Sequence, residues 1–274
     1  MRGGVRDVGD WIKAAVMAAQ LMTKLPLPFE VPWSGAVARR SIAFYPMAGA
    51  LVGAVVGVAF WAMPQALPPA PSAAFVVALW VWATGALHLD GWMDTADALG
   101  SYRSRERMLE IMKDPRVGAF GATAGTLLLL CKTTLVFSLL ELAAAGGPNV
   151  GAALAAVPVV ARMAVPWAVV RFPYAGGSGG MGAALREART RHAALSIAVG
   201  FVSAAALLAG FGSGDPELLL PALAAGAALA FAFGWAACRY VVGRLGGLTG
   251  DTYGAVIEGT ELLLLVALVA LGQP

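Results

Sequence analysis

Long apolar stretches constrain this chain more than any other feature of its sequence. Six of them reach about 20 residues, the length at which a helix crosses the ~30 Å hydrocarbon core of a bilayer. They are rich in Ala, Val and Leu, and they cover residues 42–63, 119–144, 150–170, 193–211, 218–238 and 254–272. The stretches do not alternate between apolar and polar residues, as the strands of a membrane barrel would. The sequence therefore predicts an all-α, polytopic integral membrane bundle.

Two further stretches are weaker candidates for membrane helices. Residues 72–89 form a shorter apolar run, which we expect to continue as helix into the polar segment after it. Residues 11–25 are interrupted by Lys13, Gln20 and Lys24, and either lie in the membrane interface or pack against the bundle. The expected total is seven to eight membrane helices in a single domain that covers residues 1–274.

The composition excludes the other broad classes of protein. The 274 residues are 59% hydrophobic and 13% charged, whereas soluble domains average about 25% charged residues. With 19 basic and 16 acidic side chains, a soluble enzyme of this size would cover its surface thinly. Disorder requires low hydrophobicity, and a net charge of +3 is too small to indicate nucleic-acid binding. The lipid bilayer is therefore the expected environment.

The basic residues occupy alternate loops between the predicted spans. Loops 64–71, 145–149 and 212–217 contain neither Lys nor Arg. The other loops, 26–41, 90–118, 171–192 and 239–253, hold Arg39, Arg40, Arg103, Arg105, Arg107, Lys113, Arg116, Arg171, Arg186, Arg189, Arg191, Arg239 and Arg244. Because cytoplasmic loops carry an excess of Lys and Arg, the basic loops are expected to face the cytoplasm.

Three aspartates, Asp90, Asp94 and Asp97, lie beside one of these basic loops. Their i, i+4 and i+7 spacing places them on one face of a helix. Like charges stacked in this way repel one another, and a bound cation would relieve the repulsion. Mg²⁺ prefers such carboxylates together with water and substrate phosphate, so we expect these residues to bind Mg²⁺. The alternative is a solvated helix start that favours acids through its dipole, but Asp97 lies beyond the first turn.

Further acidic and histidine candidates lie on the same expected side. Asp251 and Glu258 are seven residues apart and share a helix face. They are candidate substrate-binding groups, and the alternative is an N-cap followed by an ordinary acid. Asp114 and His88 are candidate catalytic groups, since an attacking hydroxyl requires a general base. A lone histidine at a helix end, however, is more often structural.

A dense set of basic residues accompanies the acids. Arginine suits bidentate contacts to phosphate, and Arg162 lies inside an apolar stretch, where a charge is costly and usually functional. The alternatives are membrane topology and lipid contact for the loop arginines, and snorkelling or pairing with a buried acid for Arg162. Lys132 and Glu141 receive no role. The substrate-binding candidates in this set are Arg103, Arg105, Arg107, Lys113 and Arg162, and Arg116 is a catalytic candidate.

Carboxylates that bind Mg²⁺, next to arginines at a membrane rim, indicate chemistry on a phosphate or diphosphate. No Walker A motif occurs, so the expected electrophile is an intermediate that already carries a nucleoside diphosphate. Residues 84–97, TGALHLDGWMDTAD, resemble the signature of the cobalamin synthase family, the adenosylcobinamide-GDP ribazoletransferases. Residues 107–121 and 245–255 resemble two further blocks of that family, and residues 23–28 and 44–46 resemble its N-terminal landmarks.

The chain departs from the family pattern in three places. Pro115 stands where Ser is common, Trp92 and Met93 replace a usual Leu-Ala pair, and Ala98 stands where Gly often follows the third aspartate. None of these differences removes a carboxylate, so the implied activity is not put in doubt.

The resemblance implies the last assembly step of the cobalamin nucleotide loop, in the bacterial inner membrane, with Mg²⁺ as cofactor. The implied substrates are adenosylcobinamide-GDP and α-ribazole or its 5′-phosphate, and the products are adenosylcobalamin or its 5′-phosphate and GMP. In the hypothesis that follows, Asp90, Asp94 and Asp97 hold Mg²⁺ against the diphosphate while a ribazole hydroxyl attacks. Arg105, Arg107, Lys113 or Arg116 ease the departure of GMP, and His88 or an aspartate, such as Asp97 or Asp114, acts in catalysis.

Two rival functions remain open at this stage. A CDP-alcohol phosphotransferase also uses aspartate-rich helices, but its pattern places an Ala-Arg pair after the first Asp-Gly, and none follows Gly91 at that spacing. A transporter would use Arg162 and the acidic faces as an ion path, but the acids lie at the expected rim and not at the midplane. The sequence leaves the oligomeric state open.

Overall fold

The computed structural model describes all residues except 1, 29, 147–149, 177–180, 213–215 and 273–274. Parts of the predicted loops 145–149, 171–192 and 212–217 therefore lie outside the described residues. The regular secondary structure of the described residues is helical, apart from an isolated bridge between Tyr174 and Leu248, which confirms the all-α class. The helices are α1 (Arg2–Met22), α2 (Gly35–Ser41), α3 (Tyr45–Ala62), α4 (Pro69–Thr84), α5 (Leu87–Gly100), α6 (Arg105–Ile111), α7 (Ala119–Ala144), α8 (Val150–Met163), α9 (Val165–Arg171), α10 (Met181–Leu185), α11 (Thr190–Gly210), α12 (Pro216–Leu245) and α13 (Gly250–Gly272), with 3-10 turns at Ile42–Phe44 and Met63–Gln65.

Six helical segments in the described part of the chain are long and apolar enough to cross a membrane. They are Gly35–Gln65, Ala119–Ala144, Val150–Arg171, Thr190–Gly210, Leu220–Leu245 and Gly250–Gly272, which match the six predicted stretches. The bent pair α4 and α5 raises the number to seven if it counts as one span. Seven is thus the upper limit, and the eighth expected helix is not among the candidates.

That eighth helix is α1, which packs against the bundle. Its buried side chains include Ala14, Met17 and Ala18, and they belong to a cluster with residues of α2 and α3. Asp10 on α1 accepts a hydrogen bond of 2.6 Å from Arg40 at the end of α2. Of the two expected roles for residues 11–25, packing against the bundle is the one observed.

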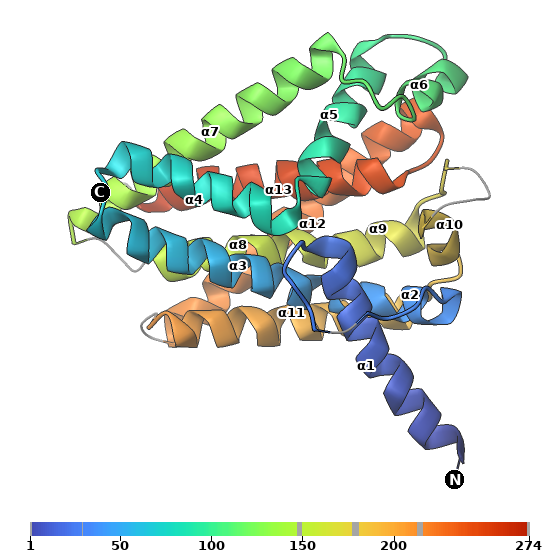
Figure 1. Ribbon diagram of the computed structural model, residues 1–274, viewed down its shortest axis with the longest axis horizontal. Helices are drawn as coiled ribbons and strands as arrows, with labels where there is room; N and C mark the ends of the chain where they lie inside the picture. The colour runs from blue at the N-terminus through green and yellow to red at the C-terminus, as the bar shows by residue number, and fades with distance from the viewer. Residues whose placement is uncertain (1, 29, 147–149, 177–180, 213–215, 273–274) are drawn as a thin grey trace.

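The stretch of residues 72–89 continues as helix into the polar segment, as expected, but with a break between two helices. The chain bends by 89° between α4 and α5. Gly85 and Ala86 lie at the bend with φ of 61° and 58°, a left-handed conformation that ends helices and that glycine adopts at little cost. The bend turns α5 across the end of the bundle, as Figure 1 shows.

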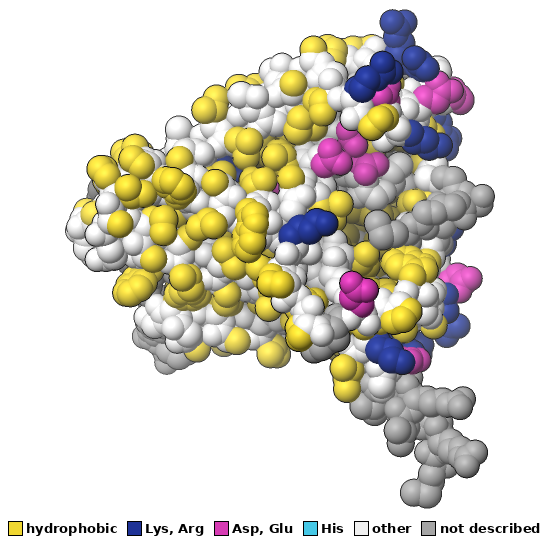
Figure 2. Space-filling view, viewed as in Figure 1, with side chains coloured by type: hydrophobic (Ala, Val, Ile, Leu, Met, Phe, Trp, Pro, Cys, Tyr) yellow, Lys and Arg dark blue, Asp and Glu magenta, His cyan; other side chains and the backbone are white. Residues whose placement is uncertain are grey.

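The long helices define one axis of the molecule, and the polar elements gather at one end of it. In Figure 1, α3, α4, α8, α11 and α13 run roughly along the long axis, while α5, α6 and α10 lie at the right-hand end. The core lies between the long helices, with α3 packed on α8 and α13 packed on both α8 and α5. Figure 2 shows the same division on its visible face, with hydrophobic side chains to the left and most charged ones to the right.

The turn between α12 and α13 fixes where α13 begins. Leu248 donates a backbone hydrogen bond to Pro173 (2.8 Å) and accepts one from Ala175 (2.7 Å). The hydroxyls of Thr249 and Thr252 each accept a hydrogen bond from the other residue's backbone N–H, at 3.3 and 2.8 Å, which is a capping arrangement that starts a helix. Asp251 is thereby held in the first turn of α13.

Candidate active site

The three aspartates of α5 share one helix face but differ in their exposure. Asp90 is exposed, Asp94 is half-buried and Asp97 is buried. Figure 2 shows acidic side chains grouped over the region of α5, with basic side chains beyond them near α6. The sequence-predicted acidic face is therefore present, and it descends from solvent toward the protein interior.

Close contact between α5 and α13 brings a fourth carboxylate to this face. A Cβ atom added at Gly91 would lie 2.5 Å from the backbone oxygen of Asp251, and one added at Gly254 would lie 3.1 Å from Cα of His88. Small residues allow two helices to approach in this way. The charges of Asp90, Asp251 and Asp97 all act on Asp94. Two helices distant in sequence thus form one acidic surface, which we call the α5–α13 acidic face (Asp90, Asp94, Asp97 and Asp251).

Asp97 has a structural task that the sequence did not reveal. Its two carboxylate oxygens accept hydrogen bonds of 2.7 Å from the backbone N–H groups of Gly118 and Gly121. These are the N-cap residue and a first-turn residue of α7, so Asp97 satisfies donors that a helix start leaves unpaired. Side chains at both glycines would collide with this carboxylate. The sequence feature that could have indicated this role is the Gly-x-x-Gly spacing of Gly118 and Gly121 at the start of an apolar helix.

The remaining carboxylates fit a metal ion that is shared with a substrate. Within the described residues, no three His, Cys, Asp or Glu side chains converge tightly enough to hold a metal ion by themselves. Mg²⁺ does not require such a cage, because it usually keeps several waters and binds through one or two carboxylates plus substrate phosphates. Asp90 and Asp94 are donors of this kind, and Asp90 is open to solvent. The predicted Mg²⁺ site is compatible with this arrangement if a phosphate completes it.

The predicted basic residues between α5 and α7 are exposed at the same end of the molecule. The guanidinium of Arg105 lies against Gly246, in the turn before α13. Arg107 forms an ion pair of 2.6 Å with Glu110, its neighbour on α6. The exposed members of this set are Arg103, Arg105, Arg107, Lys113 and Arg116. Several guanidinium groups are therefore exposed to solvent at the end of the molecule that carries the acidic face.

Asp114 is engaged with Arg116 and is a poor candidate for a general base. Nε and one terminal nitrogen of Arg116 donate to the two oxygens of Asp114, at 2.9 and 2.7 Å. These hydrogen bonds lower the pKa of Asp114 to about 2. A carboxylate with so low a pKa holds a proton weakly at neutral pH, so we place Asp114 as the residue that orients Arg116.

Two predicted substrate-binding residues, Arg162 and Glu258, lie in the interior instead. Arg162 is 0% exposed and donates to Glu261 (2.9 Å) and to the carbonyl of Pro158 (2.8 Å). Lys132 donates to Glu258 (2.5 Å) and to Glu261 (2.6 Å). The alternative for Arg162, pairing with a buried acid, is therefore the one observed. We call these four residues the buried ionic cluster.

Two members of this cluster, Lys132 and Glu261, are not among the candidate site residues predicted from the sequence. The available signal was the i, i+3 spacing of Glu258 and Glu261 in an apolar helix, together with one cation inside each of two other apolar helices. Charges inside membrane helices almost always pair with one another.

His88 borders both the interior and a cavity. It is 3% exposed, its Nδ1 lies 3.2 Å from a terminal nitrogen of Arg162, and its Nε2 lies 3.3 Å from Sδ of Met22. It lines a cavity of about 150 Å³ that Asp251 also lines. His88 is thus next to the acidic face but is not exposed to it as a free base would be.

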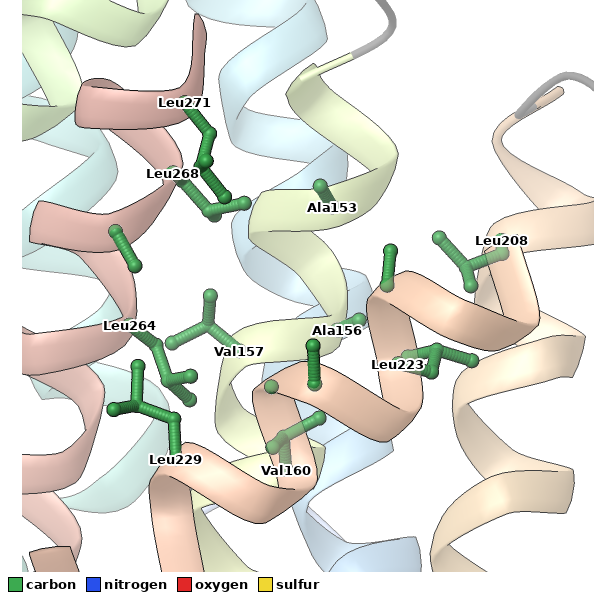
Figure 3. Close-up of a pocket in the computed structure, with 14 residues that line it drawn as sticks. Ala153, Ala156, Val157, Val160, Leu208, Leu223, Leu229, Leu264, Leu268 and Leu271 are labelled. Carbon is green, nitrogen blue, oxygen red and sulfur yellow. The ribbon is translucent and has the colours of Figure 1, made fainter. Parts of the chain in front are cut away.

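A second cavity, between α8, α12 and α13, is a poor candidate for phosphate chemistry (Figure 3). It measures about 230 Å³, and its lining consists of glycine and aliphatic side chains such as Val157, Leu223 and Leu264. None of the described lining residues can balance a phosphate charge, so this cavity does not suit a phosphate ligand.

Comparison with known proteins agrees with the sequence motifs. The sequence model of the Cobalamin-5-phosphate synthase family matches residues 14–269. Proteins named adenosylcobinamide-GDP ribazoletransferase are similar over most of their length. The one from Brevibacillus brevis is 37% identical over 262 residues, 94% of this chain and 98% of its own. Those from Pseudomonas entomophila and Desulforamulus reducens are each 38% identical; the matches cover 92% and 85% of this chain and 96% and 87% of their own. No solved structure matches the chain significantly.

Proposed function

Because this chain belongs to the Cobalamin-5-phosphate synthase family, we propose that it is the membrane transferase that completes the cobalamin nucleotide loop. It joins adenosylcobinamide-GDP to α-ribazole or its 5′-phosphate and releases GMP. The observation that carries this proposal is the α5–α13 acidic face, which lies beside exposed arginines at one end of an apolar bundle. Such a site suits a charged diphosphate that arrives from water and reacts at the membrane surface.

The acidic face supplies the charges that the reaction needs. Asp90 and Asp94 would hold Mg²⁺, and the ion would supply positive charge to neutralise diphosphate oxygens and stabilise the leaving phosphate. Asp97 stays out of this set, because both of its oxygens already accept backbone hydrogen bonds from α7. It keeps α7 against α5 and so holds the acidic face in place.

Exposed basic residues bind the diphosphate, and Asp251 accepts the proton of the attacking hydroxyl. Arg103, Arg105, Arg107 and Lys113 bind the phosphates, and Arg116, oriented by Asp114, stabilises the charge on the departing GMP. The acceptor's ribose hydroxyl attacks the phosphorus on the cobinamide side. A new P–O bond forms there while the bond to the GMP oxygen breaks. The hydroxyl's proton passes to Asp251, which is half-buried next to the other carboxylates.

The site faces the cytoplasm of a bacterial inner membrane in this proposal. Support comes from the gathering of basic side chains at the end of the molecule that carries the acids (Figure 2). Cytoplasmic segments of membrane proteins are enriched in Lys and Arg.

Measurement of GMP release tests the function directly. Purified protein in liposomes, given adenosylcobinamide-GDP, α-ribazole and Mg²⁺, should release GMP. We expect Asp94→Asn to lower the turnover about 100-fold or more, since the metal supplies several kcal/mol of charge stabilisation.

Glu187→Gln provides the matched control. Glu187 is an exposed acid paired with Arg39, so this variant should keep wild-type turnover. Full Mg²⁺-dependent turnover by a folded Asp94→Asn protein would exclude the metal assignment. Release of CMP from a CDP-alcohol, without GMP release, would instead favour the phosphotransferase alternative.

A further inference from the structure

A small cavity opens beside the acidic face, between α1, α3, α5, α10 and α13. Its volume is about 150 Å³. Its walls are aliphatic and aromatic, with Trp33, Tyr45 and Tyr253 among the lining residues. A dry apolar cavity of about 150 Å³ can hold a benzene molecule, whereas sites for drug-sized ligands measure about 300–1,000 Å³. The cavity therefore suits one ring system of a larger ligand.

Hydrogen bonding fixes which nitrogen of His88 carries the proton. A guanidinium only donates hydrogen bonds, so Nδ1 of His88 accepts from Arg162 at 3.2 Å. The proton of the neutral ring is then on Nε2, which lies 3.3 Å from Sδ of Met22. A thioether is a weak acceptor, and it is the partner that the described structure gives this N–H group. His88 and Met22 both line the cavity, so a buried donor at its wall lacks a strong acceptor.

Asp251 connects this cavity to the reaction site. It lines the cavity, and its charge acts on Asp94 of the acidic face. A ring system seated in the cavity would place whatever it carries next to these carboxylates.

We propose that this cavity binds the aromatic base of the acceptor nucleoside, and that Nε2–H of His88 donates a hydrogen bond to the base's unsubstituted ring nitrogen. The inference rests on the proposed function, because it assigns one part of that reaction's acceptor. The benzimidazole of α-ribazole is flat and bicyclic, with one ring nitrogen bonded to ribose and the other free to accept. Seated here, it brings its ribose hydroxyls to Asp251.

The other ring systems of the two substrates fit this cavity poorly. A corrin ring is far larger than 150 Å³ allows. Guanine carries several donors and acceptors, and a largely apolar cavity would leave most of them unsatisfied. The benzimidazole presents a single acceptor, which one donor such as Nε2–H of His88 can satisfy.

Two small probes test the hydrogen bond without any catalytic turnover. 1-Methylbenzimidazole has the free ring nitrogen, and 1-methylindole has the same shape with a carbon there. Ligand-observed NMR titration of the purified full chain should show roughly tenfold tighter binding of 1-methylbenzimidazole, because 1-methylindole leaves the donor unsatisfied. Equal affinities for the wild-type protein would overturn the proposal.

Variants of His88 assign the preference to that side chain. His88→Leu should abolish the preference for 1-methylbenzimidazole. His88→Gln should preserve part of it, since the glutamine amide can accept from Arg162 and still donate into the cavity. A folded His88→Leu protein that keeps the full preference would exclude His88 as the donor.

A cavity-filling variant provides a test that leaves His88 intact. Leu87 lines the cavity and is 46% exposed, so a larger side chain can enter without strain in the core. Leu87→Trp should raise KM for α-ribazole about tenfold or more and leave KM for adenosylcobinamide-GDP unchanged. The matched control is Leu127→Trp on α7, where the leucine is 56% exposed and does not line this cavity; it should change neither constant.

The outcomes separate this inference from the proposed function. If GMP is released and Leu87→Trp leaves KM for α-ribazole unchanged, the cavity assignment fails and the function stands. If GMP is never released but the His88-dependent preference persists, the proposed function fails and the cavity remains a site for a heteroaromatic ligand.

Discussion

At the scale of single residues, Asp97 shows how the backbone can use a carboxylate that looks available for a metal. Its oxygens accept two hydrogen bonds from the start of α7, where the helix dipole also favours a negative charge. Its sequence neighbours Asp90 and Asp94 lack such backbone partners among the described residues. Equal spacing on a helix face therefore does not give equal roles, because each turn of α5 meets a different part of the fold.

Asp97→Asn should destabilise the protein. Asparagine offers one acceptor oxygen in place of two, so one backbone N–H at the start of α7 would lose its partner, at a cost of about 1–3 kcal/mol. We expect a lower thermal midpoint in detergent. The matched control is Asp90→Asn, which alters an exposed acid of the same helix and should leave the midpoint unchanged. Equal midpoints for the two variants would contradict the capping role.

At the scale of helices, the buried ionic cluster links α7, α8 and α13 inside the bundle. Two cations, Lys132 and Arg162, meet two carboxylates, Glu258 and Glu261, and all four are almost fully buried. Arg162 also contacts His88 on α5. The cluster therefore fixes the positions of the helices that carry the acidic face and the acceptor cavity, although it touches no substrate in our proposal.

Lys132→Met should be strongly destabilising. Removal of one partner from a buried charge cluster costs about 3–5 kcal/mol, because the opposite charge is left uncompensated. Glu141→Gln, an exposed change on the same helix, is the matched control. The measurement is thermal unfolding in detergent, and the double variant Lys132→Met/Glu258→Leu should recover part of the loss. Similar stability of Lys132→Met and Glu141→Gln would show that the cluster contributes little.

At the scale of the whole molecule, charge is polarised along the long axis. Figure 2 shows the charged side chains concentrated at the end that holds α5 and α6. The apolar helices fill the rest of the visible face, which suits contact with lipid. A water-soluble diphosphate would therefore reach the site from one side of the membrane only.

Cysteine labelling can determine on which side of the membrane the acidic face lies. In a background without Cys131, which is exposed, Ser104→Cys lies at the acidic end and Gln65→Cys at the opposite end; both positions are exposed. An impermeant maleimide added to intact spheroplasts should label Gln65→Cys, and it should label Ser104→Cys only after permeabilisation. The reverse pattern would place the site outside the cytoplasm.

The sequence determined the features that depend on nearby residues. The length of each apolar stretch predicted the six helices that, among the described residues, are long and apolar enough to cross a membrane, because a helix satisfies its own backbone within a bilayer. The spacing of Asp90, Asp94 and Asp97 fixed an acidic face, because helical periodicity is local. Motifs spread along the chain were enough to indicate the family.

Tertiary structure alone decided which distant groups meet. Asp97 reaches Gly118 and Gly121, Lys132 reaches Glu258 and Glu261, and His88 lies between Arg162 and Met22. Local periodicity carries no information about these partners, since each contact depends on how whole helices pack. The 89° bend between α4 and α5 is likewise a feature that local periodicity does not predict. The sequence thus identified the charged groups, and the packing of α5, α7, α8 and α13 separated those that line the acidic face from those that are buried between the helices.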